Sequence, residues 1–306
     1  SPSPAVTKTL PKSAGATSFP TAVPVKGSYD GGMKRFERSP SVAKASPKLV
    51  RRMLCSFSRT VPLFPNVIIG ASQAEGVHCK GTCTLNNVWW ADVCEDAVTL
   101  KQTSGTSYIN GGGAFHASDK IVQFNGRGTV QIKDFYAEDY GKLVRSCGNC
   151  KDNGGPRNVV ISGSVAVDGG VLCGINTNYG DTCKITSSCQ NKGKYCDRYE
   201  GNSSGAEPSK IGSGPDGKYC TTSGHMARPN INCSLLYAEL LNFVLNYVKA
   251  SSLHRNHELF HTSQCYKSSS SSLDTINLHQ AKWTCASGTV HSEDCPANEP
   301  GYSTNP

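Results

Sequence analysis

The chain has 306 residues, a formal net charge of +8, 31 glycines, 15 cysteines and only 37% hydrophobic residues. No long heptad pattern is present, which argues against a coiled coil, and the glycine and cysteine content is typical of a turn-rich β protein held by disulfides. The positive charge favours a polyanion, which in an oxidising extracellular setting is an acidic polysaccharide, although a basic tail with no binding role would give the same charge.

The first 65 residues have no regular pattern. Residues 1–27 are rich in Pro, Ser, Thr and Ala and are expected to be irregular, and residues 28–33 have the composition of a turn. Residues 39–65 are basic and do not alternate between apolar and polar side chains. The chain starts at Ser1 without a charged and apolar leader, so the expected location, secreted and extracellular, rests on the cysteines.

A repeat begins at Asn66, where short β-branched runs alternate with Gly, Asn and Asp turns. Apolar residues recur at steps of 21, 23 and 23 through Val77, Val98, Ile121 and Val144. A period of roughly 20–25 residues with several short strands predicts a solenoid whose coils stack about 4.8 Å apart. These residues would face inward, as would one of the neighbours Trp89 and Trp90. A β-sandwich of short strands is the alternative.

Ten cysteines lie between Cys79 and Cys220, and their even number predicts a disulfide framework. Zinc is the alternative for Cys147 and Cys150, which have CxxC spacing, but no second such pair completes a tetrahedral site. An odd number lie outside this range and are predicted not to belong to the framework: Cys55, Cys233, Cys265, Cys285 and Cys295.

Charged residues follow the same period. Glu75, Asp96, Asp119 and Lys142 are spaced by 21, 23 and 23, so they should line up along one side of the solenoid. Carboxylates this close repel one another unless a cation compensates, and their hard oxygen ligands suit calcium. Further ionisable residues lie beside them, namely Asp92, Glu95, Lys101, Lys120 and Arg145. A lysine held near other cations has a lowered pKa and can act as a base, whereas a surface salt-bridge ladder is the alternative without chemistry.

The last part of the chain differs in character. Leucine and valine recur at helical spacing over residues 233–250, which predicts a surface-packed helix with charges that make it a poor membrane span. Residues 268–273 are nearly all serine, and the last thirty residues are expected to be disordered.

Several motifs resemble, in order and spacing, the pectate lyases of polysaccharide lyase family 3 across roughly residues 66–220. They begin at Asn66 (NVIIGA), Ala74 (AEGVHC), Asn87 (NVWWADVCEDA), Gly112 (GGAFHASDK) and Gly141 (GKLVRSCGNC). The resemblance implies an all-β fold, a right-handed parallel β-helix formed as a single-stranded solenoid. Outside it, composition and spacing predict an irregular N-terminal segment and a partly helical or disordered tail. It also implies calcium-dependent β-elimination of polygalacturonate to unsaturated oligogalacturonides.

The resemblance also implies residue roles. Calcium would bind Glu75, Glu95 and Asp96, where the family often has Asp in place of Glu75. The cationic catalytic positions match Lys101, Lys120 and Arg145. We expect Lys120 to be the base, with Arg145 the second choice because its intrinsic pKa is high. Substrate contacts are expected from Lys142, His116 and Asp119.

The match is poor at both ends. We expect residues 1–65 to hold a lead-in and divergent first coils, 66–223 the catalytic β-helix, and 224–306 a divergent tail. Residues 42–65 depart so far from the family that we hypothesise a compensated frameshift there, which would remove one coil's strands and expose the edge of the next.

Two other functions remain open at this point. One is a β-helix that binds polygalacturonate without cleaving it. The other is a polygalacturonase-like hydrolase, which would need paired carboxylates free for acid and base roles. In each case the expected partner is polygalacturonate or pectin, with neither nucleic acid nor membrane as a partner, and the protein is expected to be a monomer.

Overall fold

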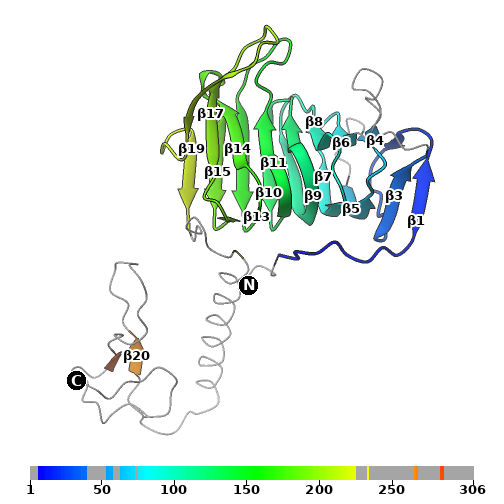
Figure 1. The fold of residues 1–306 in the computed structure, drawn as a ribbon, viewed down its shortest axis with the longest axis horizontal. Coiled ribbons are helices and arrows are strands. Elements are labelled where there is room, and N and C mark those ends of the chain that lie inside the picture. Colours follow the sequence, from blue (N-terminus) through cyan, green and yellow to red (C-terminus); the bar gives the residue numbers. More distant parts are fainter. Residues whose placement is uncertain are drawn as a thin grey trace. The chain divides into compact units, whose positions relative to one another are not determined.

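A computed structural model gives the fold and describes residues 6–39, 53–57, 63–73, 75–224, 233, 265–267 and 283–285. The chain divides into two compact units, residues 1–240 and 241–306. Within the second unit, β20 (Cys265–Lys267) and β21 (Trp283–Cys285) form an antiparallel pair. The first unit is a parallel β-helix, whose stacked strands follow one another along Figure 1 from β1 to β19.

Three parallel ladders make up the β-helix. The first ladder carries the candidate site and stacks these strands in order: β2 (Val23–Val25), β4 (Met53–Phe57), β6 (Glu75–Cys79), β8 (Asp96–Leu100), the end of β9 (Thr106–Phe124), the end of β11 (Tyr136–Ser146), β14 (Val171–Asn176) and β17 (Cys196–Glu200). A final strand, β18 (Ser209–Ser213), pairs with β17 antiparallel.

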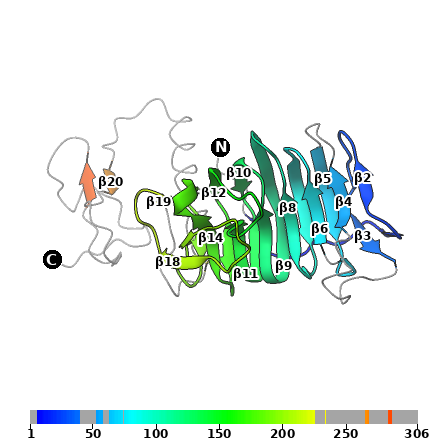
Figure 2. The same ribbon diagram turned by 90° about the horizontal axis from the view of Figure 1, so that it is seen from above.

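The other two ladders share several long strands. The second ladder stacks the start of β5 (Leu63–Ile69), the start of β7 (Thr84–Trp90), the start of β9, β10 (Gly128–Lys133), β12 (Arg157–Ser162), β15 (Thr182–Thr186) and β19 (Cys220–Ser223). The third stacks β1 (Ala16–Phe19), β3 (Lys34–Arg38), the ends of β5 and β7, the middle of β9, the start of β11, β13 (Val165–Val167) and β16 (Cys189–Gln190). Figure 2 shows the same stack from above.

A column of left-handed residues forms the corner between the second and third ladders. Asn66 and Asn87 have φ values of 57° and 53°, and Gly111 and Asp134 follow at 62° and 53°. Asparagine, aspartate and glycine adopt this conformation more readily than other residues. The Asn87 side-chain amide also donates to Asn66 Oδ1 at 2.9 Å, one coil below. The repeated Asn-Val pattern in the sequence therefore marks this corner.

The interior confirms the predicted solenoid with one correction. In the first ladder, Val77 and Val98 pair with Val122 and then Val144, and all four are fully buried. The predicted column contained Ile121 instead, which is also buried but lies at an unpaired position beside the column.

The two neighbouring tryptophans behave differently from each other. Trp90 belongs to the main core, as expected for one of the pair. Trp89 lies outside that cluster and is nevertheless 1% exposed, because its ring stacks on Phe115 at 6.4 Å.

Disulfides hold the coils together, and their pairing corrects the predicted framework. Four disulfides join neighbouring cysteines within the predicted range: Cys79–Cys83, Cys147–Cys150, Cys173–Cys183 and Cys196–Cys220. A disulfide rather than zinc therefore explains the CxxC motif. Cys189 pairs with Cys233, so Cys233 belongs to the framework after all. Because Cys189 pairs outside the range, the ten cysteines do not form a closed set.

The divergent segment still contributes a strand. Residues 53–57 form β4, which pairs in parallel with β2 below and β6 above, so the expected loss of strands and exposed edge are wrong for these residues. The rest of 42–62 lies outside the described residues. So do 234–250 of the predicted helix, the serine run and, apart from β21, the last thirty residues. At residues 283–285 the expected disorder is wrong, because they form β21. Within the described segments, no helix has the length and apolar character needed to cross a membrane.

Candidate active site

The candidate active site is a pocket of about 290 Å³ on the outer face of the first ladder. Its charged lining comes from β6, from β8 and the residues flanking it, and from the end of β9: Glu75, Glu95, Asp96, Lys101 and Lys120. Its remaining lining is polar: His78, Thr99, Gln123 and Asn125. The strand register explains the gathering, because Glu75 pairs with Asp96 and Asp96 pairs with Lys120.

Two of the three carboxylates are little exposed, whereas Glu95 is exposed. Glu75 and Asp96 are 9% and 8% exposed. Burial, together with the nearby charges of Asp119 and Glu95, raises the pKa of Asp96 to about 7 against the opposing effect of Lys120. A cation bound beside a buried carboxyl group and its acidic neighbours would stabilise the ionised form of that group.

The donor set fits calcium in its chemistry. Three carboxylates from adjacent coils line one pocket, and hard oxygen ligands are those that calcium prefers. Within the described part of the chain, no three acidic, His or Cys side chains already converge as a finished metal site. One reason is that Glu75 contacts His78 Nε2.

Lys120 lies between two carboxylates. Its Nζ is 3.4 Å from Asp96 Oδ1 and also contacts Asp119 Oδ2. Burial lowers the pKa of Lys120, but the Asp96 and Asp119 carboxylates outweigh this effect and the pKa is raised. The neighbours that set this direction are acidic, and the expected lowering of the pKa by calcium and nearby cations stays a prediction.

Lys101 and Lys142 flank the pocket. Lys101 Nζ is 3.2 Å from His78 Nδ1 on the neighbouring strand. Lys142 lies one coil beyond Lys120 in the same column, and its Nζ is 3.4 Å from Asp119 Oδ1. Asp119 thus bridges two lysines and does not itself occupy the column, which corrects the predicted spacing. Because Asp119 is anionic, it is suited to position Lys120 and Lys142 rather than to bind a uronate directly.

Arg145 is adjacent to the pocket and does not line it. Its backbone pairs with Gln123, which does line the pocket. Its guanidinium donates to Asn176 Oδ1 at 3.0 Å and lies 3.9 Å from the centre of the Tyr199 ring. The side chain is 7% exposed, and burial lowers the pKa of Arg145. Glu75, Asp96 and Lys120 therefore lie along one side of the solenoid, as expected. Arg145 lies one coil further along.

His116 is not brought to the pocket. It has a φ of 58° and pairs with Asp139, whose φ is 53°, so the two stack at the corner between the third and first ladders. His116 Nδ1 is 2.9 Å from Asp139 Oδ2, and both side chains are more than half exposed. The expected substrate contact has no support from this position.

Several residues at the site were not singled out from the sequence. His78, Thr99 and Gln123 share a column, three residues after Glu75, Asp96 and Lys120. Asn176 and Tyr199 fix Arg145 from β14 and β17. The period that aligned the acids could have indicated the column of His78, Thr99 and Gln123. No local sequence feature marks Asn176 and Tyr199.

Fold and cluster together define a class: a parallel β-helix protein whose site of carboxylates and lysines suits an anionic ligand. Comparison with known proteins makes this specific. The family model described as pectate lyase matches residues 7–205. The chain belongs to the pectate lyase family, whose members are polysaccharide lyases.

Two relatives and two solved structures illustrate the match. The chain is 47% identical to a probable pectate lyase F of Aspergillus fumigatus over 60% of this chain and 79% of the relative. It is 43% identical to pectate lyase E of Emericella nidulans over 72% and 86%. The catalytic domain of pectate lyase PelI from Erwinia chrysanthemi aligns with a TM-score of 0.58 at 28% identity, covering 69% of this chain and all of that one. PelI in complex with tetragalacturonic acid aligns at 0.55 and 27%, covering 68% and 69%.

Proposed function

We propose that the chain is a calcium-dependent pectate lyase that cleaves polygalacturonate by β-elimination and releases unsaturated oligogalacturonides. The observation that carries the proposal is the single pocket in which Glu75, Glu95 and Asp96 lie beside Lys101 and Lys120. The relative solved with tetragalacturonic acid supports an oligogalacturonate substrate. The five disulfides support a secreted, extracellular enzyme, which we propose acts as a monomer.

The metal site is proposed to consist of Glu75, Glu95 and Asp96. When bound there, calcium supplies positive charge beside the uronate carboxylate, which acidifies the neighbouring C5–H bond. The raised pKa of Asp96 shows how poorly this pocket tolerates its own negative charge.

Lys120 is the proposed base. It lines the pocket, whereas the Arg145 guanidinium is held by Asn176 and Tyr199. Burial lowers the pKa of Lys120, and a cation bound to Asp96 would remove one of the two carboxylates, Asp96 and Asp119, that oppose this effect. Lys120 Nζ then takes the C5 proton, the C4–C5 double bond forms, and the C4–O bond breaks. The leaving oxygen takes a proton from water.

Two other cations are proposed to orient the substrate. Arg145 can bind a uronate carboxylate with parallel hydrogen bonds, and its contacts with Asn176 and Tyr199 fix its plane beforehand. Lys101, which follows β8 and lines the pocket, would hold a neighbouring sugar carboxylate. The residues named in this mechanism all lie within 66–223, the range proposed as the catalytic domain.

An absorbance assay tests the proposal. The purified protein is mixed with polygalacturonate and calcium, and the ultraviolet absorbance of the unsaturated product is followed over time. A rise that chelator abolishes is expected. Binding without any rise, in folded protein, would instead indicate a polygalacturonate-binding β-helix, and release of reducing ends without absorbance in the presence of chelator would indicate a hydrolase.

A further inference from the structure

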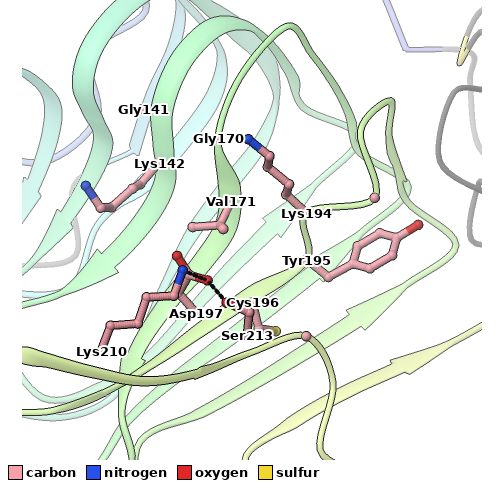
Figure 3. Close-up of a pocket in the computed structure, with 12 residues that line it drawn as sticks. Gly141, Lys142, Gly170, Val171, Lys194, Tyr195, Cys196, Asp197, Lys210 and Ser213 are labelled. Atoms are coloured by element: carbon pink, nitrogen blue, oxygen red, sulfur yellow. Dashed lines mark hydrogen bonds and ion pairs between the residues drawn. The ribbon is translucent and has the colours of Figure 1, made fainter.

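A second hollow lies on the first ladder beyond the candidate active site. It has a volume of about 500 Å³, within the range of roughly 300–1,000 Å³ usual for small-molecule sites. Its chemically active lining comes from four successive parts of the fold, drawn in Figure 3: Lys142, Val171, Lys194, Asp197, Lys210 and Ser213. None of these residues has a role in the mechanism above.

The hollow continues the column of the active site. Lys120 pairs with Lys142, and Lys142 pairs with Val171. The amide of Leu172 donates to the carbonyl of Lys194 at 3.1 Å, which places Lys194 beside Val171 on the next coil. Successive coils are about 4.8 Å apart, so Lys194 lies about 10 Å beyond Lys142 along the same line. A linear ligand that occupies the active site would therefore reach the hollow in extended form.

Side-chain size explains why there is a hollow at this place. The column holds long charged side chains at Lys142 and Lys194 and only the short, buried Val171 between them. Figure 3 shows the Lys142 and Lys194 amino groups on either side of Val171, with Lys210 reaching in from the opposite strand. That strand, β18, is the antiparallel addition to the last coil, so the hollow has a wall that the rest of the first ladder lacks.

The charge of the hollow is positive. Three lysines and one aspartate line it. Lys210 Nζ is 2.7 Å from Asp197 Oδ1, and Ser213 Oγ donates to the same oxygen at 2.8 Å, so Asp197 anchors the Lys210 side chain. Lys194 forms no ion pair with any residue in the described ranges. An ammonium group is thus left for an anion at the open side of the hollow.

We propose that this hollow is a carboxylate-binding subsite, formed by Lys142, Lys194 and Lys210, for a further uronate of the acidic polysaccharide whose cleavage is proposed above. The inference rests on that proposed function for its ligand. Three observations support the subsite together: the spacing of the lysines along one column, a hollow large enough for a sugar, and a net positive lining. Since methyl esterification removes the carboxylate charge, the subsite favours unesterified stretches of the chain.

A binding experiment tests the subsite without relying on catalysis. Electrophoresis of the folded protein through gels that contain polygalacturonate and chelator measures affinity when calcium cannot contribute. We expect Lys194→Gln with Lys210→Gln to weaken retardation by about five- to tenfold, as for two exposed ion pairs. The matched control is Lys184→Gln with Lys133→Gln, two exposed lysines of β15 and β10 on the second ladder, which leave retardation unchanged.

Two further readouts separate binding from folding and from chemistry. Lys194→Arg keeps the charge and should restore the affinity that Lys194→Gln loses, and 1 M salt should abolish the difference between variants. In the calcium assay, the double variant should raise KM by a similar factor while kcat at saturating substrate stays within about twofold.

The outcomes distinguish this inference from the proposed function. If the subsite variant and the control variant are retarded equally, or if methyl-esterified pectin retards the wild type as strongly as polygalacturonate, the subsite is overturned. If the wild type forms no unsaturated product with calcium, the proposed function fails, and the retardation of the variants still decides the subsite.

Discussion

Lys120 Nζ lies 3.4 Å from Asp96 Oδ1 because the two residues face each other across β8 and β9. The proposed base and a proposed metal ligand are therefore one coil apart. Their ion pair raises the pKa of the lysine in this structure, so proton abstraction is coupled to the occupation of the carboxylates.

The first prediction concerns Lys120. We expect Lys120→Ala to lower kcat by about 10²- to 10⁴-fold, since a general base contributes on that order. The measurement is ultraviolet absorbance with polygalacturonate at saturating calcium. Lys184→Ala, which removes an exposed lysine of β15, serves as the control. Retention of more than a tenth of wild-type kcat by Lys120→Ala would assign the proton to another group.

The second prediction concerns calcium. Asp96→Asn removes one proposed ligand charge and should raise the calcium concentration for half-maximal activity by on the order of tenfold. Calorimetric titration of calcium into the protein without substrate measures the same loss independently of turnover. Asp139→Asn, at the corner far from the pocket lining, is the control. Equal calcium affinity in the wild type and Asp96→Asn would contradict the assigned ligand set.

The third prediction concerns the support of Arg145 by Tyr199. The guanidinium lies 3.9 Å from the ring centre, and a cation–π contact of this kind contributes about 0.5–2 kcal/mol. Tyr199→Leu should lower kcat/KM by about 2- to 30-fold, whereas Tyr199→Phe keeps the ring and most of the activity. Arg145→Lys should be more damaging than either, because lysine cannot make the paired hydrogen bonds. A Tyr199→Phe variant as impaired as Tyr199→Leu would show that the hydroxyl, not the ring face, matters.

The fourth prediction concerns His116 and pH. The hydrogen bond that His116 donates to Asp139 raises the pKa of His116, against a smaller opposing effect of burial. A raised folded-state pKa stabilises the protein fully below the ordinary histidine value near 6.5 and loses this contribution as pH rises through the folded value. Histidine resonances followed by NMR against pH should show His116 titrating above 6.5, and Asp139→Asn should bring it down. Unchanged titration in that variant would exclude the contact in solution.

The fifth prediction concerns the disulfide between Cys189 and Cys233. It closes a sequence separation of 44 residues. Removing it with Cys189→Ser and Cys233→Ser should lower the free energy of unfolding by up to about 4 kcal/mol in the chain-entropy picture. Denaturant unfolding measures the change, and non-reducing peptide mapping verifies the link. Cys94→Ser, which breaks no disulfide, should change stability by about 0.5 kcal/mol or less.

Much of the architecture was accessible from sequence patterns. The recurrence of Asn-Val runs predicted coils, and the structure shows why: asparagine at Asn66 and Asn87 adopts the left-handed corner that ends one strand and starts the next. The steps between acids predicted that Glu75 and Asp96 would stack, and they pair directly. Local conformation and a nearly constant period depend on neighbouring residues, so both can be predicted from the sequence alone.

The exact register was not accessible. A step of 23 from Asp96 put Asp119 in the column, whereas Lys120 occupies it. The coil between Asp96 and Lys120 is one residue longer, and an irregularity near Tyr140 compensates. A slip of one residue moves a side chain to the other face of a strand. Counting could therefore find the acidic and basic cluster without deciding which of two adjacent residues enters the pocket.

By itself, the sequence determined that this chain stacks short strands in coils and concentrates acids and lysines on one flank, because both follow from local composition at a steady spacing. Tertiary structure alone decided three further matters: the partner of Cys189, the direction of the Arg145 guanidinium, and the wall that Lys210 adds to the second hollow. Each depends on residues brought together from coils separated by tens of positions, where packing and hydrogen bonding, rather than periodicity, select the contact.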